Sequence, residues 1–143
     1  MKPKVIVVDA YGTVLDITSY NGQDCEDRFF QRQGFEEILE ALRKNCTKDA
    51  RVVCVSCEPR KDAARVMRDM REAGVDVSRF DKMYRFDGKP DFERIARDYK
   101  VKPSRIEFVA HLWNGWRNSF LEALHARVCI SIPWYIQIDW DAL

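Results

Sequence analysis

The feature that most limits what this chain can fold into is a short apolar run near its start. Val5 to Val8 are consecutive aliphatic residues without polar alternation, which is typical of a strand covered on both faces in a parallel sheet. Asp9 ends the run, and Gly12 and Thr13 soon follow, so that a turn begins where the strand leaves the sheet. Open α/β sheets bind their ligands at this carboxyl edge. Asp9 is therefore a candidate nucleophile or metal ligand.

The rest of the chain alternates apolar strands with amphipathic helices. Apolar residues recur at helical spacing in several segments, and apolar runs of strand length separate these segments. This alternation predicts an α/β fold: a doubly wound, Rossmann-like three-layer sandwich with a central parallel sheet of about five strands, in a single domain over residues 1–143. After the first strand, the expected strands are 51–55, 82–86, 106–110 and 128–132, the expected helices are 35–44, 60–74, 91–99 and 113–124, and residues 17–28 are expected to form a loop.

The helix expected after the second strand shows a simple division of faces. Its apolar residues are predicted to pack on the sheet, and its charged residues are predicted to face water. The first set is Ala63, Val66, Met67 and Met70, and the second is Arg65, Arg68, Asp69 and Arg71.

Composition excludes several classes of protein. Lys and Arg total 24 and Asp and Glu total 23, so the chain lacks the basic excess typical of a nonspecific nucleic-acid binder. No apolar run approaches the ~18 residues of a membrane span, and the N-terminus does not resemble a signal peptide. The five cysteines are scattered, which favours reduced thiols in a cytoplasmic protein. Cys54 and Cys57 match a C-x-x-C spacing, but no second Cys or His pair completes a zinc site, so a structural role is expected.

Four segments together resemble the haloacid dehalogenase-like (HAD) hydrolase superfamily. Asp9–Val14 matches its first motif, an aspartate followed by a Gly-Thr turn at the end of a strand. Val52–Ser56 matches the second, an apolar strand that ends in Ser or Thr. The third is a lysine, commonly in a Gly-Lys-Pro context, which matches Asp87–Phe92; Val101–Ser104 resembles the usual entry to the fourth strand. The resemblance covers about residues 4–132 and implies a HAD-like fold.

The resemblance also implies roles for individual residues. Asp9 would be the nucleophile that forms a phosphoryl ester, and Lys89 would neutralise the carboxylate and the phosphate. Ser56 and the main-chain N–H groups of the turn after Asp9 would hold phosphate oxygens. Thr13 is expected to brace this turn rather than to touch substrate, and His111 is expected either to contact substrate or to pack in its loop. The residues assigned to substrate binding are Gly12, Thr13, Ser56, Cys57 and His111.

Two departures from the family pattern affect the expected chemistry. Tyr11, which the resemblance assigns to the catalytic residues, stands where most family phosphatases have a second aspartate, the general acid and base. A phenol with a pKa near ~10 is a poor base at neutral pH. Residues 110–119 contain no carboxylate, although the fourth motif of the family uses one to bind Mg²⁺. We therefore expect Mg²⁺ to bind weakly, with Asp9, the backbone carbonyl of Tyr11 and Asn114 as its ligands.

Three functions remain open at this point. The spacing between the motifs leaves no room for a cap domain, so the leading prediction is a capless phosphatase that acts on a small or macromolecular phosphomonoester. The second is a pseudoenzyme that keeps the fold for binding or assembly, and the third is a 2-haloacid dehalogenase-type hydrolase, which tolerates Tyr11 and needs no metal. The apolar tail at 133–143 is expected either to fold back on its own chain or to cross to a second subunit and form a homodimer.

Overall fold

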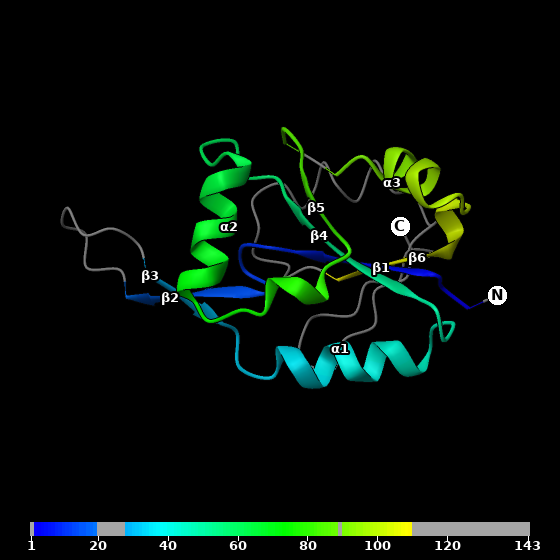
Figure 1. The fold of residues 1–143 in the computed structure, drawn as a ribbon, viewed down its shortest axis with the longest axis horizontal. Coiled ribbons are helices and arrows are strands. Elements are labelled where there is room, and N and C mark those ends of the chain that lie inside the picture. The colour runs from blue at the N-terminus through cyan, green and yellow to red at the C-terminus, as the bar shows by residue number, and fades with distance from the viewer. Residues whose placement is uncertain (1, 20–27, 89, 110–143) are drawn as a thin grey trace, which may run out of the picture.

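The centre of the molecule is a parallel sheet of four strands in the order β5-β4-β1-β6 (Figure 1). The computed structural model describes residues 2–19, 28–88 and 90–109. Within them the sheet confirms the predicted α/β doubly wound class. The strands are β1 (Val5–Asp9), β4 (Arg51–Ser56), β5 (Lys82–Arg85) and β6 (Ile106–Val109). The helix expected at 113–124, the strand expected at 128–132 and the tail at 133–143 lie outside the described residues.

Strand β1 lies in the middle of the sheet, as its uninterrupted apolar run predicts. Every residue of β1 is buried, including Asp9 at its end. Val7 pairs in register with Val53 of β4 on one side and with Phe108 of β6 on the other. Because all these strands run parallel, their carboxyl ends meet at one edge of the sheet, and Asp9 lies at that edge.

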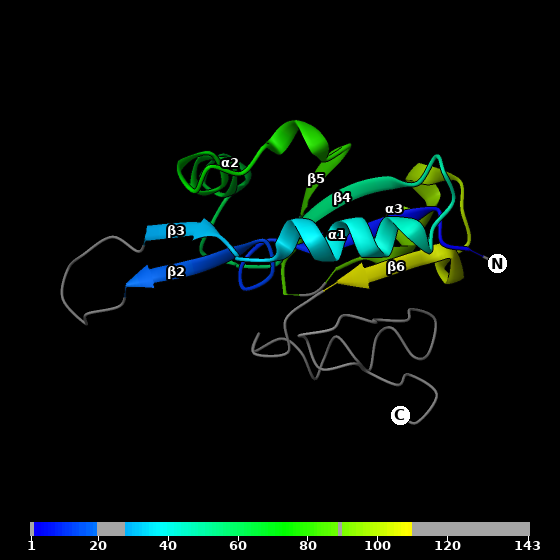
Figure 2. The ribbon, with the colours of Figure 1, turned by 90° about the horizontal axis from the view of Figure 1, so that it is seen from below.

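Helices complete the outer layers. Helix α1 (Phe35–Lys44) lies on one face of the sheet and α3 (Phe92–Tyr99) lies on the opposite face, whereas α2 (Ala63–Glu72) stands next to β3 (Figures 1 and 2). Two short 3-10 helices, η1 (Val77–Arg79) and η2 (Pro103–Arg105), precede β5 and β6. None of the helices in the described ranges is long and apolar enough to cross a membrane.

The helix boundaries follow from caps and apolar spacing. In α1 the buried residues are Phe35, Ile38, Leu39 and Leu42, the spacing of one helix face. Asp62 caps α2 by accepting a hydrogen bond from the Arg65 N–H at 2.8 Å. Asp91 caps α3 in the same way through the Arg94 N–H at 3.0 Å. Each such cap typically contributes about 1 kcal/mol.

The loop predicted for residues 17–28 is wrong in part. Strands β2 (Leu15–Ser19) and β3 (Arg28–Gln31) form a two-stranded antiparallel ribbon, which projects beyond the carboxyl end of β1 (Figures 1 and 2). Leu15 is fully buried and Phe29 packs against the core, so the ribbon is anchored at the end that joins the domain. The apolar alternation of Leu15 and Ile17 is too short, and the polar sequence after it too long, for the sequence to predict strands here.

Candidate active site

Asp9 is held at the carboxyl end of β1 by the chain that turns away from it. The Ala10 N–H donates to the Val55 carbonyl at 2.8 Å and continues the β1–β4 ladder past Asp9. The Val14 N–H then donates to the Asp9 carbonyl at 3.2 Å, and the Leu15 N–H donates to the Ala10 carbonyl at 2.9 Å. These bonds close the turn of residues 10–14, which we call the nucleophile turn. Asp9 is 2% exposed.

Gly12 is required by the backbone of the nucleophile turn. Its φ angle is 91°, in the left-handed region that side chains with a Cβ rarely adopt. Its N–H donates to the Leu15 carbonyl at 2.8 Å, and its own carbonyl accepts a bond from Arg32 Nη1 at 3.3 Å. Thr13, which follows, is completely buried. The predicted substrate-binding residues Gly12 and Thr13 therefore belong to the turn that begins at Asp9.

Ser56 ends β4 at the same edge of the sheet. Asp9 pairs in register with Val55, so Ser56 lies one position beyond the partner of Asp9. Its side chain is 1% exposed, and its Oγ has no hydrogen-bond partner among the residues that the structure describes. A buried hydroxyl left unsatisfied costs about 1–3 kcal/mol. An oxygen of a bound ligand would satisfy it, which suits the predicted role of Ser56 toward phosphate.

The cysteines near the site are protonated thiols. Cys46, Cys54 and Cys57 are buried and form no disulfide in the described part of the chain. Burial raises the pKa of Cys57 well above its usual value, and the negative charge of Asp9 raises it further. The same two causes raise the pKa of Cys54. Because a thiolate is the reactive form, neither residue is poised as a nucleophile or a zinc ligand. Cys25 and Cys129 lie outside the described residues.

Tyr11 projects from the nucleophile turn into a cluster of charged and aromatic side chains. Its hydroxyl donates to Asp69 Oδ2 on α2 at 2.6 Å. The Lys61 ammonium donates to the same oxygen at 2.7 Å and lies 4.6 Å from the centroid of the Tyr11 ring. Phe29 of β3 meets the Tyr11 ring edge-on, with 5.3 Å between centroids. We call Tyr11, Phe29, Lys61, Arg65 and Asp69 the α2 cluster.

The α2 cluster keeps Tyr11 neutral. Burial raises the pKa of its phenol far above the usual value, and the hydrogen bond to Asp69 and the charge of that carboxylate raise it further. The hydroxyl proton of Tyr11 is donated in the hydrogen bond to Asp69. Tyr11 is thus even less suited to act as a base at neutral pH than a solvated tyrosine.

The prediction that Asp69 is solvated helix surface is wrong. Asp69 is 4% exposed, and its second oxygen, Oδ1, lies 3.7 Å from Arg65 Nε. Val66, Asp69 and Met70 are the buried residues of α2, whereas Ala63 is exposed and Met67 is partly exposed. The signal was present in the spacing, because Val66, Asp69 and Met70 follow i, i+3, i+4. A buried carboxylate at such a position needs partners, and Tyr11, Lys61 and Arg65 provide them.

The remaining predicted site residues are Lys89, His111 and Asn114, and all three lie outside the described residues. Gly88, before Lys89, has a φ of 85°, and Asp87 pairs with Arg85 at 2.9 Å. Within the described ranges no three His, Cys, Asp or Glu side chains form a group that could hold a metal ion. The described candidate ligands, the Asp9 carboxylate and the Tyr11 carbonyl, do not by themselves make a Mg²⁺ site.

Comparisons with known proteins identify no family for this chain. No family model matches the sequence, and no curated protein matches it. Among solved structures, the chain is similar to the cobalt-bound form of the deoxy-D-mannose-octulosonate 8-phosphate phosphatase from Haemophilus influenzae, with 15% identity and a TM-score of 0.39. The similarity covers 77% of this chain and 59% of that one. A likeness at this level establishes neither the family nor the activity of the chain.

Proposed function

We propose that this protein is a HAD-type phosphohydrolase that cleaves phosphomonoesters through a covalent ester on Asp9. The observation that supports this most is the pairing of two buried polar side chains at adjacent strand ends. Asp9 offers a carboxylate, and one position beyond its partner in β4 the Ser56 hydroxyl has no partner in the described part of the chain. The motifs at Asp9–Val14, Val52–Ser56 and Asp87–Phe92 point to the same chemistry.

The reaction would take two displacements at phosphorus. A carboxylate oxygen of Asp9 attacks the phosphorus atom, and the bond to the leaving oxygen breaks, with its electron pair going to the leaving group. Water then attacks the phosphoryl ester, the bond between phosphorus and the Asp9 oxygen breaks, and inorganic phosphate leaves. The Ser56 hydroxyl would donate to a phosphoryl oxygen in both steps, and the Lys89 ammonium would offset the negative charge. Mg²⁺, which we expect to bind weakly, would add to that charge neutralisation when bound.

The α2 cluster suggests which phosphomonoesters react. Because the Tyr11 proton is donated to Asp69, Tyr11 does not protonate the leaving oxygen. Esters whose leaving group is stable as an anion, such as aryl phosphates, therefore suit this site better than alkyl phosphates do. The same hydrogen bond favours the second candidate function, a binding protein that keeps the fold without turnover.

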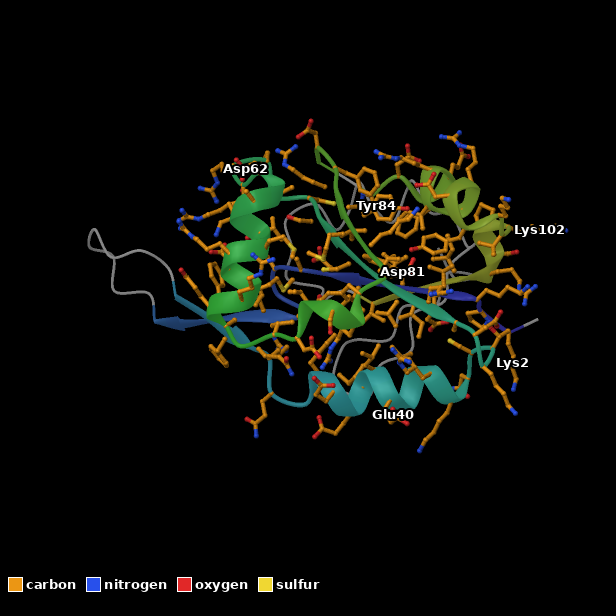
Figure 3. All side chains as sticks on the ribbon, viewed as in Figure 1. Lys2, Glu40, Asp62, Asp81, Tyr84 and Lys102 are labelled. Carbon is orange, nitrogen blue, oxygen red and sulfur yellow. The ribbon has the colours of Figure 1, made fainter. Side chains whose placement is uncertain are left out.

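The test is hydrolysis of an aryl phosphate by three variants. Asp9→Asn should reduce kcat at least about 10³-fold, because the nucleophile is lost, and Ser56→Ala should reduce kcat about 10- to 100-fold. Glu40→Gln is the matched control: it also turns a carboxylate into an amide, but on the exposed outer side of α1 (Figure 3), and it should leave the rate unchanged.

Intact-mass measurement of wild-type protein quenched during turnover should show one added phosphoryl group that is absent from Asp9→Asn. Wild-type turnover equal to that of Asp9→Asn would instead support the binding protein. Release of halide from a 2-haloacid, with no phosphatase activity, would support the dehalogenase alternative.

A further inference from the structure

We propose that Asp69 of α2 is a positioning residue for the Asp9 site, which acts through Tyr11 on the nucleophile turn. The inference rests on the proposed function, because the turn matters only if it holds a substrate. Asp69 itself is 60 residues along the chain from Asp9, on an element outside the central sheet. Its link to the site is the hydrogen bond from Tyr11, two residues after Asp9.

Within the described residues, three segments of the chain meet around the Tyr11 ring. Its hydroxyl is bonded to Asp69 at 2.6 Å, Phe29 of the ribbon meets it edge-on, and the Lys61 ammonium lies 4.6 Å from its centroid. Lys61 also lies 4.4 Å from the centroid of the Phe29 ring. The side chain in the middle of the nucleophile turn is therefore fixed at its tip and on its ring by groups from α2, from the segment before α2 and from β3.

The charges of the α2 cluster suit it to hold the Tyr11 side chain in place rather than to transfer its proton. A relay would require Asp69 to accept the Tyr11 proton while Tyr11 accepts one from water or from the substrate. Lys61 donates to one oxygen of Asp69, and Arg65 lies near the other, so each oxygen of this carboxylate already has a cation beside it. The pair is therefore suited to fix the direction of Tyr11 rather than to move a proton.

Holding the Tyr11 side chain in place also restrains the backbone of the nucleophile turn. Residues 10–14 form a closed turn with hydrogen bonds at both ends, and one of them, from the Val14 N–H to the Asp9 carbonyl, ties this turn to the proposed nucleophile. A displacement of about 1 Å of a reacting group can reduce a rate about 100-fold. Releasing Tyr11 from Asp69 should thus weaken catalysis without removing any group that touches the substrate.

The test compares Tyr11→Phe and Asp69→Asn with Tyr84→Phe and Asp98→Asn. The second pair breaks a similar bond, from the Tyr84 hydroxyl to Asp98 at 2.7 Å, between β5 and α3. Either change in the α2 cluster should reduce kcat for an aryl phosphate about 10- to 100-fold with KM changed less than about threefold, and the double variant should lose no more than the worse single variant. The control pair should keep the wild-type kcat.

A second readout separates this inference from the proposed function. In the intact full-length protein, amide hydrogen exchange at Gly12, Val14 and Leu15 should be faster in Tyr11→Phe than in Tyr84→Phe. Tyr11→Phe keeps the ion pair between Asp69 and Lys61, so it serves if Asp69→Asn fails to fold. An active wild type with unchanged kcat in Tyr11→Phe overturns the inference and leaves the phosphatase intact. If the wild type is inactive, the proposed function and the catalytic part of this inference fail together; faster exchange in Tyr11→Phe then supports only the claim that Asp69 holds the nucleophile turn through Tyr11, and unchanged exchange overturns that claim as well.

Discussion

Three tyrosine hydroxyls donate to aspartates in the described part of the chain, and two of these bonds, Tyr11–Asp69 and Tyr84–Asp98, lie in regions with different surroundings. Tyr11 donates to Asp69 at 2.6 Å beside the candidate site, and Tyr84, which is labelled in Figure 3, donates to Asp98 at 2.7 Å between β5 and α3. Each tyrosine ring also has a cation near it: Lys61 at 4.6 Å from the Tyr11 centroid, and the Arg94 guanidinium carbon at 5.5 Å from that of Tyr84. Burial, followed by the aspartate, raises the pKa of both phenols.

The surroundings of the two aspartates differ. Asp69 is 4% exposed and has Lys61 and Arg65 around it, whereas Asp98 is exposed on the surface of α3. The first bond joins residues 58 positions apart, and the second joins residues 14 apart on consecutive elements of the chain. The same pair of residue types therefore connects distant segments in one region and fastens neighbouring ones in the other.

The largest expected difference is in the loss of stability when the carboxylate is neutralised. Asp69→Asn leaves Lys61 and Arg65 beside a buried amide, and because both cations are partly exposed we expect a cost of about 3 kcal/mol, the low end for breaking a buried ion pair. Asp98→Asn keeps a hydrogen-bond acceptor for Tyr84 in an exposed place, so it should cost less than about 1 kcal/mol. Urea unfolding of the two variants measures both losses. Equal losses would mean that the burial of Asp69 has no energetic consequence.

Removing only the phenol hydroxyls should give a smaller difference in the same direction. Tyr11→Phe breaks a part-buried hydrogen bond to a carboxylate and should lower the free energy of unfolding by about 2 kcal/mol. Tyr84→Phe loses a bond to an exposed carboxylate and should cost about 1 kcal/mol. Chemical unfolding at several salt concentrations tests the contrast. A greater loss in Tyr84→Phe than in Tyr11→Phe would reverse the comparison.

The parts of the fold that the sequence predicts are those decided by local pattern. The apolar run of β1 and the i, i+3, i+4 spacing of α1 give their positions directly, because one strand is buried on both faces and one helix face is buried. The ribbon of β2 and β3 is missed because its pairing depends on anchoring by Leu15 and Phe29, and the alternation along its strands is too short to predict them.

The residues of the candidate site also include some that local sequence pattern predicts and others that it does not. Asp9 and Ser56 are predicted from strand ends, and the parallel register places them near one another at the edge of the sheet. Asp69 is missed because a carboxylate in a helix rich in arginine looks like solvated surface, and its burial becomes plain only when Tyr11, from another part of the chain, is beside it. The roles of Lys89, His111 and Asn114 stay predictions.

The smallest expected effect is the change of stability with pH. It tests whether a group in either of the two regions titrates between pH 5 and 8. Neither phenol titrates near neutral pH, but Glu107 of β6, which belongs to neither region, does: burial raises its pKa from 4.5 to about 7. The folded state then holds this proton more tightly than the unfolded state, so its contribution to stability is full below pH 4.5 and is lost as the pH rises through 7. The full shift corresponds to about 3 kcal/mol, and since water reaches part of the side chain we expect a loss of about 1 kcal/mol between pH 5 and 8.

Unfolding measured across that range should show this loss in the wild type, in Tyr11→Phe and in Tyr84→Phe alike, and Glu107→Gln should abolish it. A pH slope that persists in Glu107→Gln, or that differs between the two tyrosine variants, would place the titrating group in one of the two regions instead.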